Sequence, residues 1–113
     1  MNKIVYSPKA QNDLDEIWAY ISEKLLNPTA AENTINGILD TIDALQEHSE
    51  IGKPLYFSSD LFSGYRFLVY KNYLAFYRTS GNTVYIDRII YGKRDYMRLL
   101  FKDLDQSERI YAH

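Results

Sequence analysis

Four consecutive residues, Gly92, Lys93, Arg94 and Asp95, form the stretch of the chain with the clearest chemical character. A glycine followed by two cations exposes charge beside the backbone N–H groups that open a helix, and such a position attracts anions. The same stretch can also be no more than an exposed ion pair, which contributes little. It therefore predicts an anion-contacting site only if further cations converge on it.

Three arginines upstream of this stretch, Arg66, Arg78 and Arg88, are the further cations. Together with that stretch they could bind phosphates or stabilise the added charge of a transition state at phosphorus. Cleavage of RNA would also require a proton acceptor for the 2′-hydroxyl and a proton donor for the leaving oxygen. Because arginine keeps its proton in proteins, those roles would fall to Lys71, Lys93 or tyrosines.

Charge is distributed unevenly along the chain. Residues 1–63 contain four cations and ten acids, whereas residues 64–102 contain eight cations and two acids, within a net charge of −2 for all 113 residues. The overall charge argues against a basic nucleic-acid-binding protein, but the asymmetry predicts that the second half faces an anion. The alternative is a solvated sheet edge that uses cations to prevent edge-to-edge pairing.

Tyrosines are concentrated in the second half of the chain, since nine of the eleven lie from Tyr56 onward. Aromatic rings interleaved with cations are typical of proteins that bind single-stranded nucleic acid, where the rings stack on bases and the cations contact phosphates. Tyrosine is also a favoured strand residue and a common anchor of protein interfaces. Both interpretations stay open, and Tyr91, directly before Gly92, is a candidate contact in either.

Composition excludes several classes of site. The chain has no cysteine, and its two histidines, His48 and His113, are far apart, which excludes thiolate chemistry, disulfides and histidine-rich metal clusters. We expect no metal and no cofactor.

Asp13 and Glu16, three residues apart on a predicted helix, are expected to be solvated acids rather than an acid–base pair. Because the N-terminus lacks signal-peptide features and no apolar run approaches about 18 residues, we expect a cytoplasmic protein without membrane contact.

The first half predicts a short strand and two helices. Residues 3–6 form the strand, and Ser7 followed by Pro8 is an N-cap with proline at the first helical position. Asn27 and Pro28 repeat that signal, so a second helix begins there. Apolar residues recur at steps of three and four along both helices, at Leu14, Ile17, Trp18, Ile21 and Leu25, then at Ala31, Ile35, Ile38, Leu39, Ile42 and Leu45. With so short a break, the helices form an antiparallel hairpin.

The second half is predicted to form strands, because its periodicity falls to two and β-forming residues dominate. Strands are expected at residues 65–71, 73–79 and 83–91, with a turn at Lys71 and Asn72, a long loop at residues 52–63, and a last short helix at residues 95–102. The fold class is therefore α+β, with an N-terminal strand and an antiparallel helical hairpin packed on one face of an antiparallel β-sheet meander. Residues 1–102 form a single domain and residues 103–113 a tail.

Helices on one face of such a sheet leave the other face for water or a partner. We expect this free face to be electropositive. Strand alternation places Arg66 on the same side as Leu68 and Tyr70. In the last strand neither alternating set is cleanly apolar, so its inward face stays open.

The residues that carry a family resemblance lie at 7–10, 13–14 and 17–21 in the first helix, 27–31 at the start of the second, and 88–95 from the end of the last strand onward. In this order and spacing, over about residues 3–101, they resemble the RelE/ParE superfamily of bacterial toxins. The resemblance implies a small α+β toxin that is neutralised by a co-expressed antitoxin, whose largely disordered segment wraps over it. RelE-like toxins cut mRNA in the ribosomal A site, and ParE-like toxins inhibit DNA gyrase.

Individual positions bear on the choice between these branches. Arg94 falls where RelE-like enzymes carry a catalytic arginine, and Arg66 falls near one of their strand lysines. Leu68, Leu74 and Leu100 depart from the cations and the tyrosine that such enzymes place there. The Asn-Pro-x-Ala-Ala opening of the second helix is more similar to the ParE branch, which we favour.

The favoured interpretation is therefore a ParE-like toxin that binds a cognate antitoxin and acts on DNA gyrase. Its target-binding residues would be Arg66, Arg78, Arg88, Tyr91, Lys93 and Arg94. The first alternative is a ribosome-dependent mRNA endoribonuclease with Arg66 and Arg94 as catalytic residues, aided by Lys71 and Lys93. The second alternative is a non-catalytic protein-binding module or a degenerate toxin that keeps only its partner binding.

Overall fold

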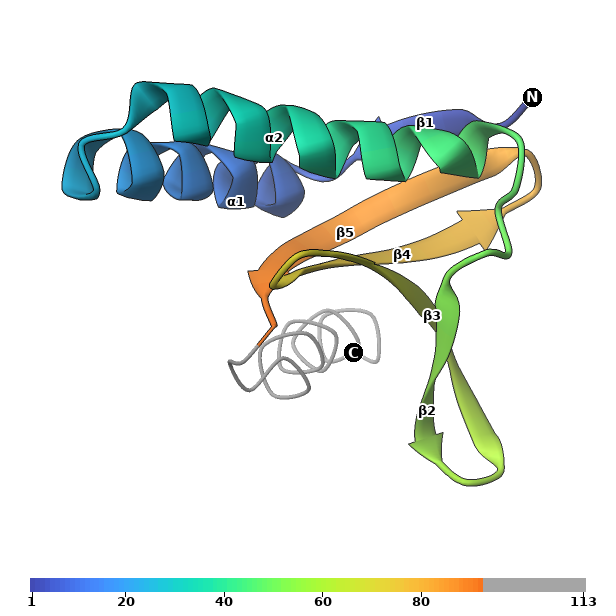
Figure 1. Ribbon diagram of the computed structural model, residues 1–113. Helices are drawn as coiled ribbons and strands as arrows, with labels where there is room; N and C mark the ends of the chain where they lie inside the picture. The colour runs from blue at the N-terminus through green and yellow to red at the C-terminus, as the bar shows by residue number, and fades with distance from the viewer. Residues whose placement is uncertain (93–113) are drawn as a thin grey trace, which may run out of the picture.

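The computed structural model describes residues 1–92 of the chain (Figure 1). The predicted last helix and tail, together with Lys93 and Arg94, lie outside the described residues. A first strand leads into two helices that lie side by side on one face of a five-stranded sheet of order β1-β5-β4-β3-β2 (Figure 1). The elements are β1 (Lys3–Tyr6), α1 (Pro8–Ala19), the π-helical turn η1 (Tyr20–Lys24), α2 (Pro28–Asp43), the 3₁₀ turn η2 (Ala44–Gln46), β2 (Lys53–Ser58), β3 (Leu61–Tyr70), β4 (Tyr73–Ser80) and β5 (Thr83–Tyr91).

Both helices begin where the sequence predicts. The Ser7 hydroxyl accepts the Ala10 N–H at 3.0 Å, and the Asn27 side chain accepts the Ala30 N–H at 3.0 Å. Each cap satisfies an N–H group that the first helical turn leaves without a partner. Between the helices the backbone reverses at Leu26, whose φ is +52°. Among the described helices, none has the length and apolarity needed to cross a membrane.

The three predicted strands are confirmed as β3, β4 and β5, but the predicted loop at residues 52–63 is wrong. It contains β2 and the turn into β3. Pro54 is tolerated because β2 is an edge strand whose pairing with β3 shifts register on either side of Tyr56. The sheet is also mixed rather than purely antiparallel, since β1 pairs with β5 in parallel from Lys3 to Tyr6.

A β-bulge in β5 explains why neither alternating set of that strand is cleanly apolar. Tyr77 pairs with Ile86 and Phe76 pairs with Arg88, so Asp87 is an additional residue. Beyond a bulge, alternating side chains exchange faces. Val84 and Ile86 before the bulge and Ile89 after it therefore all face the helices.

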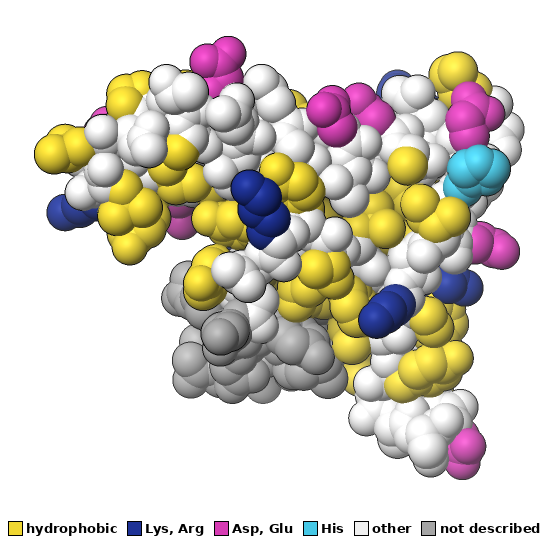
Figure 2. Space-filling model, in the orientation of Figure 1, with side chains coloured by type: hydrophobic (Ala, Val, Ile, Leu, Met, Phe, Trp, Pro, Cys, Tyr) yellow, Lys and Arg dark blue, Asp and Glu magenta, His cyan; other side chains and the backbone are white. Residues whose placement is uncertain are grey.

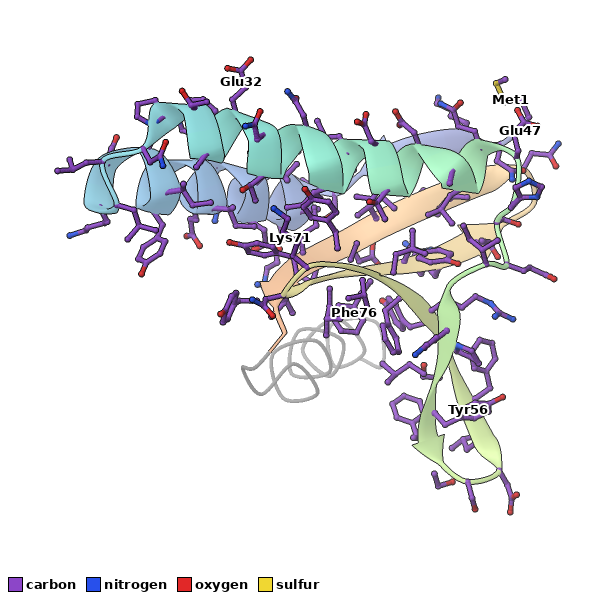
Figure 3. The ribbon with its side chains drawn as sticks, viewed as in Figure 1. Met1, Glu32, Glu47, Tyr56, Lys71 and Phe76 are labelled. Atoms are coloured by element: carbon purple, nitrogen blue, oxygen red, sulfur yellow. The ribbon has the colours of Figure 1, made fainter. Side chains whose placement is uncertain are left out.

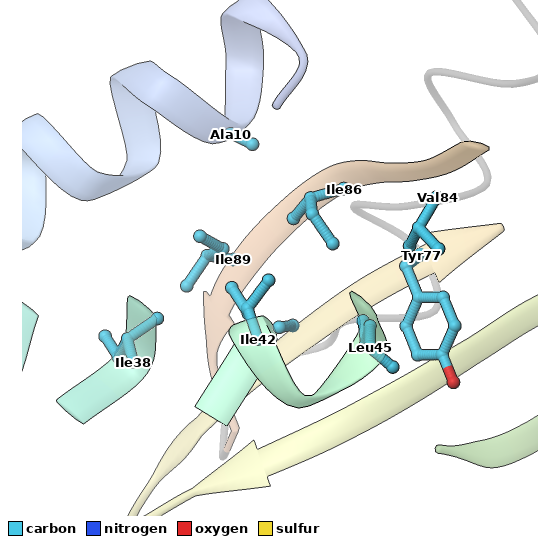
Figure 4. Close-up of a cluster of buried hydrophobic side chains, with 9 residues drawn as sticks. Ala10, Ile38, Ile42, Leu45, Tyr77, Val84, Ile86 and Ile89 are labelled. Carbon is cyan, nitrogen blue, oxygen red and sulfur yellow. The ribbon is translucent and has the colours of Figure 1, made fainter. Parts of the chain in front are cut away.

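The main core lies between the helices and the sheet (Figure 4). Ile38 and Ile42 of α2 and Leu45 of η2 are at most 2% exposed. They pack with buried residues of the sheet and of α1, namely Ala10, Ala75, Tyr77, Val84, Ile86 and Ile89. The predicted stripe of α2 is thus confirmed as the inward face of that helix.

A second apolar cluster lies on the opposite face of the sheet, where Figure 3 shows Phe76 pointing away from α2. Phe76 is fully buried, and it packs with Leu55, Tyr65 and Ile90, which are at most 7% exposed. Phe67 and Leu74 complete the cluster. The expectation that this face is free and electropositive is therefore wrong for the described residues.

Ser7 links the start of α1 to the bulge, because its hydroxyl also donates to the Asp87 carbonyl at 2.8 Å. Replacing Ser7 by alanine removes the helix cap and this bond together, so we expect a loss of about 1–2 kcal/mol in the free energy of unfolding. Urea denaturation measures it. Ser22→Ala is the matched control, since the Ser22 hydroxyl only donates to the carbonyl of Trp18 within the helix. Equal losses for the two variants would contradict the linking role of Ser7.

Candidate functional site

Arg66 lies on the helix-side face of β3, opposite Tyr77. Its Nη1 donates to the Gly52 carbonyl at 3.1 Å and to the Glu50 carbonyl at 3.4 Å. The guanidinium carbon also lies 5.7 Å from the centre of the Phe62 ring. Arg66 therefore fastens the segment after η2 to the sheet.

Arg78 lies on the opposite face of the sheet, with its side chain 46% exposed. Its Nε lies 3.0 Å from Asp87 Oδ2, and its guanidinium carbon lies 4.5 Å from the centre of the Tyr85 ring. The Tyr65 hydroxyl donates to the same carboxylate oxygen at 2.9 Å. Burial, and next the charge of Asp87, raise the pKa of Tyr65, so its hydroxyl stays a hydrogen-bond donor. Arg78 thus sits in a network built around the bulge residue.

Arg88 lies at the edge of β5, beyond the end of β1. Its Nε and Nη2 donate to the Asp13 carboxylate of α1 at 2.9 and 3.1 Å. The same carboxylate accepts the Ile89 N–H at 2.8 Å. Because β1 ends its pairing at Ile86, Asp13 takes over the edge of β5 where the parallel strand stops. Asp13 is only 7% exposed, so the prediction of a solvated acid is wrong.

The structure therefore does not gather the described members of the predicted set, Arg66, Lys71, Arg78 and Arg88, into one surface. Arg66, Arg78 and Arg88 occupy three different settings, and each contacts carbonyl or carboxylate oxygens. Lys71 lies apart from them at the β3–β4 turn, with its Nζ 5.5 Å from the Tyr70 ring. Figure 2 likewise shows Lys and Arg side chains in separate places on the visible face. The expectation that these cations converge is wrong for the described residues. It depends on the alternation of side chains along each strand, which takes account neither of the bulge in β5 nor of acids on other elements.

An open groove of about 870 Å³ lies between the helical hairpin and the ends of β4 and β5. It has the size of a ligand or peptide-binding cleft. The described residues that line it are Asp13, Glu16, Ile17, Tyr20, Ile21, Leu25, Ala30, Thr34, Tyr73, Arg88, Ile89, Ile90 and Tyr91. Of the residues predicted from sequence, the groove brings together Arg88 and Tyr91.

Three tyrosines surround one end of this groove. The Tyr73 and Tyr91 rings meet edge to face, with centroids 5.6 Å apart. Burial raises the pKa of Tyr73, and Tyr91 and Tyr20 raise it further. Tyr20 and Tyr91 are 57% and 43% exposed, so their rings remain open to a partner. Tyr20 is not among the site residues predicted from sequence, although it follows Glu16 by four residues and the two side chains therefore lie side by side on a helix.

The described groove suits binding better than phosphate chemistry. Its lining contains two carboxylates, those of Asp13 and Glu16, against one guanidinium, which already pairs with Asp13. That balance disfavours a phosphate. Within residues 1–92, no group of three or more acidic or histidine side chains is placed to hold a metal ion. The described lining of the groove is thus largely apolar and weakly acidic.

Comparison with known proteins finds relatives that match most of this chain. Residues 4–96 match the family described as the ParE toxin of type II toxin–antitoxin system, parDE. Toxin ParE1 of Caulobacter vibrioides is 33% identical over 85 residues, covering 75% of this chain and 83% of that toxin.

Solved structures agree with that match. The chromosomal ParDE toxin–antitoxin system from P. aeruginosa contains a chain with a TM-score of 0.67 and 26% identity, covering 80% of this chain and 96% of that one. A chain of the YoeB–YefM complex from Staphylococcus aureus shares the fold, with a TM-score of 0.52 and 19% identity, covering 80% of this chain and 97% of that one.

Proposed function

The chain belongs to the ParE toxin family of type II toxin–antitoxin systems, and on that premise we propose that it arrests growth by inhibiting DNA gyrase until a cognate antitoxin binds it. The action would take place in the cytoplasm. The observation that carries the proposal is the family match over residues 4–96, which spans every described strand and helix except Lys3, the first residue of β1.

The settings of the arginines support inhibition by binding rather than RNA cleavage. A ribonuclease of this type would require Arg66 to be available to the scissile phosphate, but Arg66 donates to the Gly52 and Glu50 carbonyls. Arg88 is committed to Asp13 in the same way. We therefore assign target contact to Tyr91, Lys93 and Arg94, and keep Arg78 as a further contact because its side chain is 46% exposed.

Two activity assays separate the branches. Purified toxin is added to a gyrase supercoiling reaction and, separately, to ribosomes programmed with mRNA. We expect loss of supercoiling, relieved by the antitoxin, and intact mRNA. Cleavage of mRNA with normal supercoiling would establish the ribonuclease alternative. Inactivity in both assays, together with harmless expression in cells that lack the antitoxin, would favour the binding module or degenerate toxin.

Arg94→Ala tests the assigned contact. Removing one charged contact from an interface typically costs about 2 kcal/mol or more when that contact is desolvated, so we expect at least about a tenfold rise in the toxin concentration that halves supercoiling. Lys24→Ala is the matched control, because Lys24 is an exposed cation of η1 that is not among the residues assigned to the target. If both variants inhibit like the wild type, Arg94 does not contact the target.

A further inference from the structure

Arg78 and Tyr85 stand directly opposite each other on the neighbouring strands β4 and β5. The guanidinium carbon of Arg78 lies 4.5 Å from the centre of the Tyr85 ring, so the planar group rests over an aromatic face. The ring quadrupole attracts a cation in this position, and a planar guanidinium stacks well on such a face. The ring therefore limits the directions in which the Arg78 side chain can point.

The β-bulge supplies a second support for Arg78. Asp87 is the additional residue of that bulge, and its Oδ2 lies 3.0 Å from Arg78 Nε. Asp87 is itself held at two points, because its carbonyl accepts the Ser7 hydroxyl at 2.8 Å and its Oδ2 accepts the Tyr65 hydroxyl at 2.9 Å. Bulges often re-aim a side chain next to a functional site. This one brings a fixed carboxylate to the Nε edge of the guanidinium.

The outer edge of the same guanidinium stays open. Within residues 1–92 neither Nη1 nor Nη2 of Arg78 has a hydrogen-bond partner, and the side chain is 46% exposed. The two Nη groups of a guanidinium donate in parallel directions, which match the two oxygens of a carboxylate. Because the Nε edge and one face are already occupied, the open edge has a defined direction. Arg78 is thus a preorganised receptor for an anion with two acceptor oxygens.

The charges around this receptor favour a carboxylate of a protein over the phosphates of DNA. Asp87 already balances the charge of Arg78, and binding to DNA depends on several cations that contact successive phosphates. Arg66 and Arg88 do not add to the site, because Arg66 lies on the other face of the sheet and Arg88 pairs with Asp13. One Asp or Glu side chain, by contrast, needs only a single bidentate contact.

We propose that Arg78 binds a carboxylate on the protein that the toxin inhibits, and that Asp87, Tyr65 and Tyr85 are positioning residues that hold its guanidinium for this contact. The inference rests on the proposed function, because it takes that protein to be DNA gyrase. It adds the chemical group that the target must present to this face of the sheet. It also makes the contact depend on the geometry of the guanidinium and not on its charge alone.

The toxin concentration that halves supercoiling by gyrase tests the geometry of the contact. Arg78→Lys keeps the charge but loses the planar pair of donors, so we expect that concentration to rise about fivefold or more. Tyr85→Leu removes the aromatic platform and is expected to raise it about two- to fivefold. Tyr85→Phe keeps the ring and is expected to restore inhibition to within about twofold of the wild type.

Asp87→Asn distinguishes an anion from a cation on the target. The amide oxygen can still accept the bonds from Arg78 and Tyr65, but the negative charge that repels a carboxylate of the target is gone. We expect this variant to inhibit about two- to threefold more strongly than the wild type, with a smaller gain at high salt. Unchanged or weaker inhibition would mean that no anion of the target lies beside Asp87, and it would overturn the inference.

Matched controls lie on another strand. Lys53→Met removes an exposed cation of β2, and Tyr56→Leu removes a tyrosine of that strand that is 48% exposed. Both are expected to inhibit like the wild type. The melting temperature and the affinity for the antitoxin are measured for every variant, so that a change in inhibition is assigned to the contact only where both are unchanged. If Tyr85→Leu unfolds, Arg78→Lys and Asp87→Asn decide the test.

The outcomes separate this inference from the proposed function. If Arg78→Lys inhibits like the wild type, the bidentate contact does not exist and the inference is overturned, even though the wild type inhibits gyrase. If the wild type binds duplex DNA without gyrase and Arg78→Lys loses that binding as strongly as it loses inhibition, the contact is a phosphate and the inference is overturned as well.

Growth arrest in cells that lack the antitoxin provides a measurement independent of gyrase. If the wild type arrests growth but leaves supercoiling intact, the gyrase proposal fails. The inference then stands, for another target protein, only when Arg78→Lys arrests growth less strongly and Asp87→Asn more strongly than the wild type. A wild type that neither arrests growth nor inhibits supercoiling would overturn both.

Discussion

Replacing Asp13 by alanine is expected to lower the free energy of unfolding by about 3–5 kcal/mol, because it breaks a largely buried ion pair with Arg88. Asp13 Oδ2 lies 2.9 Å from Arg88 Nε and 2.8 Å from the Ile89 backbone nitrogen. The truncation therefore also removes the acceptor of a buried backbone N–H, and the desolvation of that group is then uncompensated. Urea denaturation followed by circular dichroism measures the loss.

Two further variants show whether the buried pair is the cause. Asp15→Ala removes an exposed acid from the same helix and is expected to change stability by less than about 0.5 kcal/mol. Asp13→Ala combined with Arg88→Met removes both charges and is expected to recover part of the stability lost by the single change. If Asp13→Ala is no more harmful than Asp15→Ala, the pair does not hold α1 to β5.

Local chemistry made the helices predictable. A capping side chain followed by proline acts within one turn of chain, so Ser7 with Pro8 and Asn27 with Pro28 specify both starts without any knowledge of the tertiary structure. The stripe of α2 was likewise readable, because burial of one helix face imposes a period of 3.6 residues. The β3–β4 turn at Lys71 also stands where the sequence placed it, with Lys71 at a φ of +53°.

Features that depend on contacts between distant segments were not predictable in the same way. The bulge at Asp87 is held from outside β5, by the Ser7 hydroxyl on its carbonyl and by the Tyr65 hydroxyl on its carboxylate. A prediction that assumes strict alternation along β5 therefore assigns every side chain on one side of the bulge to the wrong face of the sheet. The β2 strand was missed because Pro54 and the serines around it resemble a loop, while its pairing partner lies in β3.

The candidate site likewise combines residues that the sequence identifies with a residue that only the fold brings to them. Sequence identified Arg88 and Tyr91 as residues with chemical character, and both line the groove. The sequence does not identify Asp13 as the partner of Arg88, because 75 residues separate Asp13 from Arg88. A lone aspartate on a helix is usually solvated, and only the end of β1 shows why this one covers the edge of β5. Charge counted along the sequence consequently overstated the cationic surface, since it did not subtract pairs formed across the fold.

Replacing Phe76 by alanine is expected to cost about 3–5 kcal/mol of stability, as truncations of buried aromatic residues do. Phe76 is fully buried on the face of the sheet opposite the helices, and its ring centre lies 5.8 Å from that of Phe67. Val69→Ala is the matched control, because Val69 points to the same face of the sheet but is 52% exposed. We expect the Val69→Ala change to cost less than about 0.5 kcal/mol.

Thermal denaturation distinguishes the two variants. A melting temperature for Phe76→Ala close to that of Val69→Ala would mean that this face of the sheet contributes no core. A large difference would establish that the sheet is stabilised from both faces, which removes the open basic surface that the charge pattern predicts.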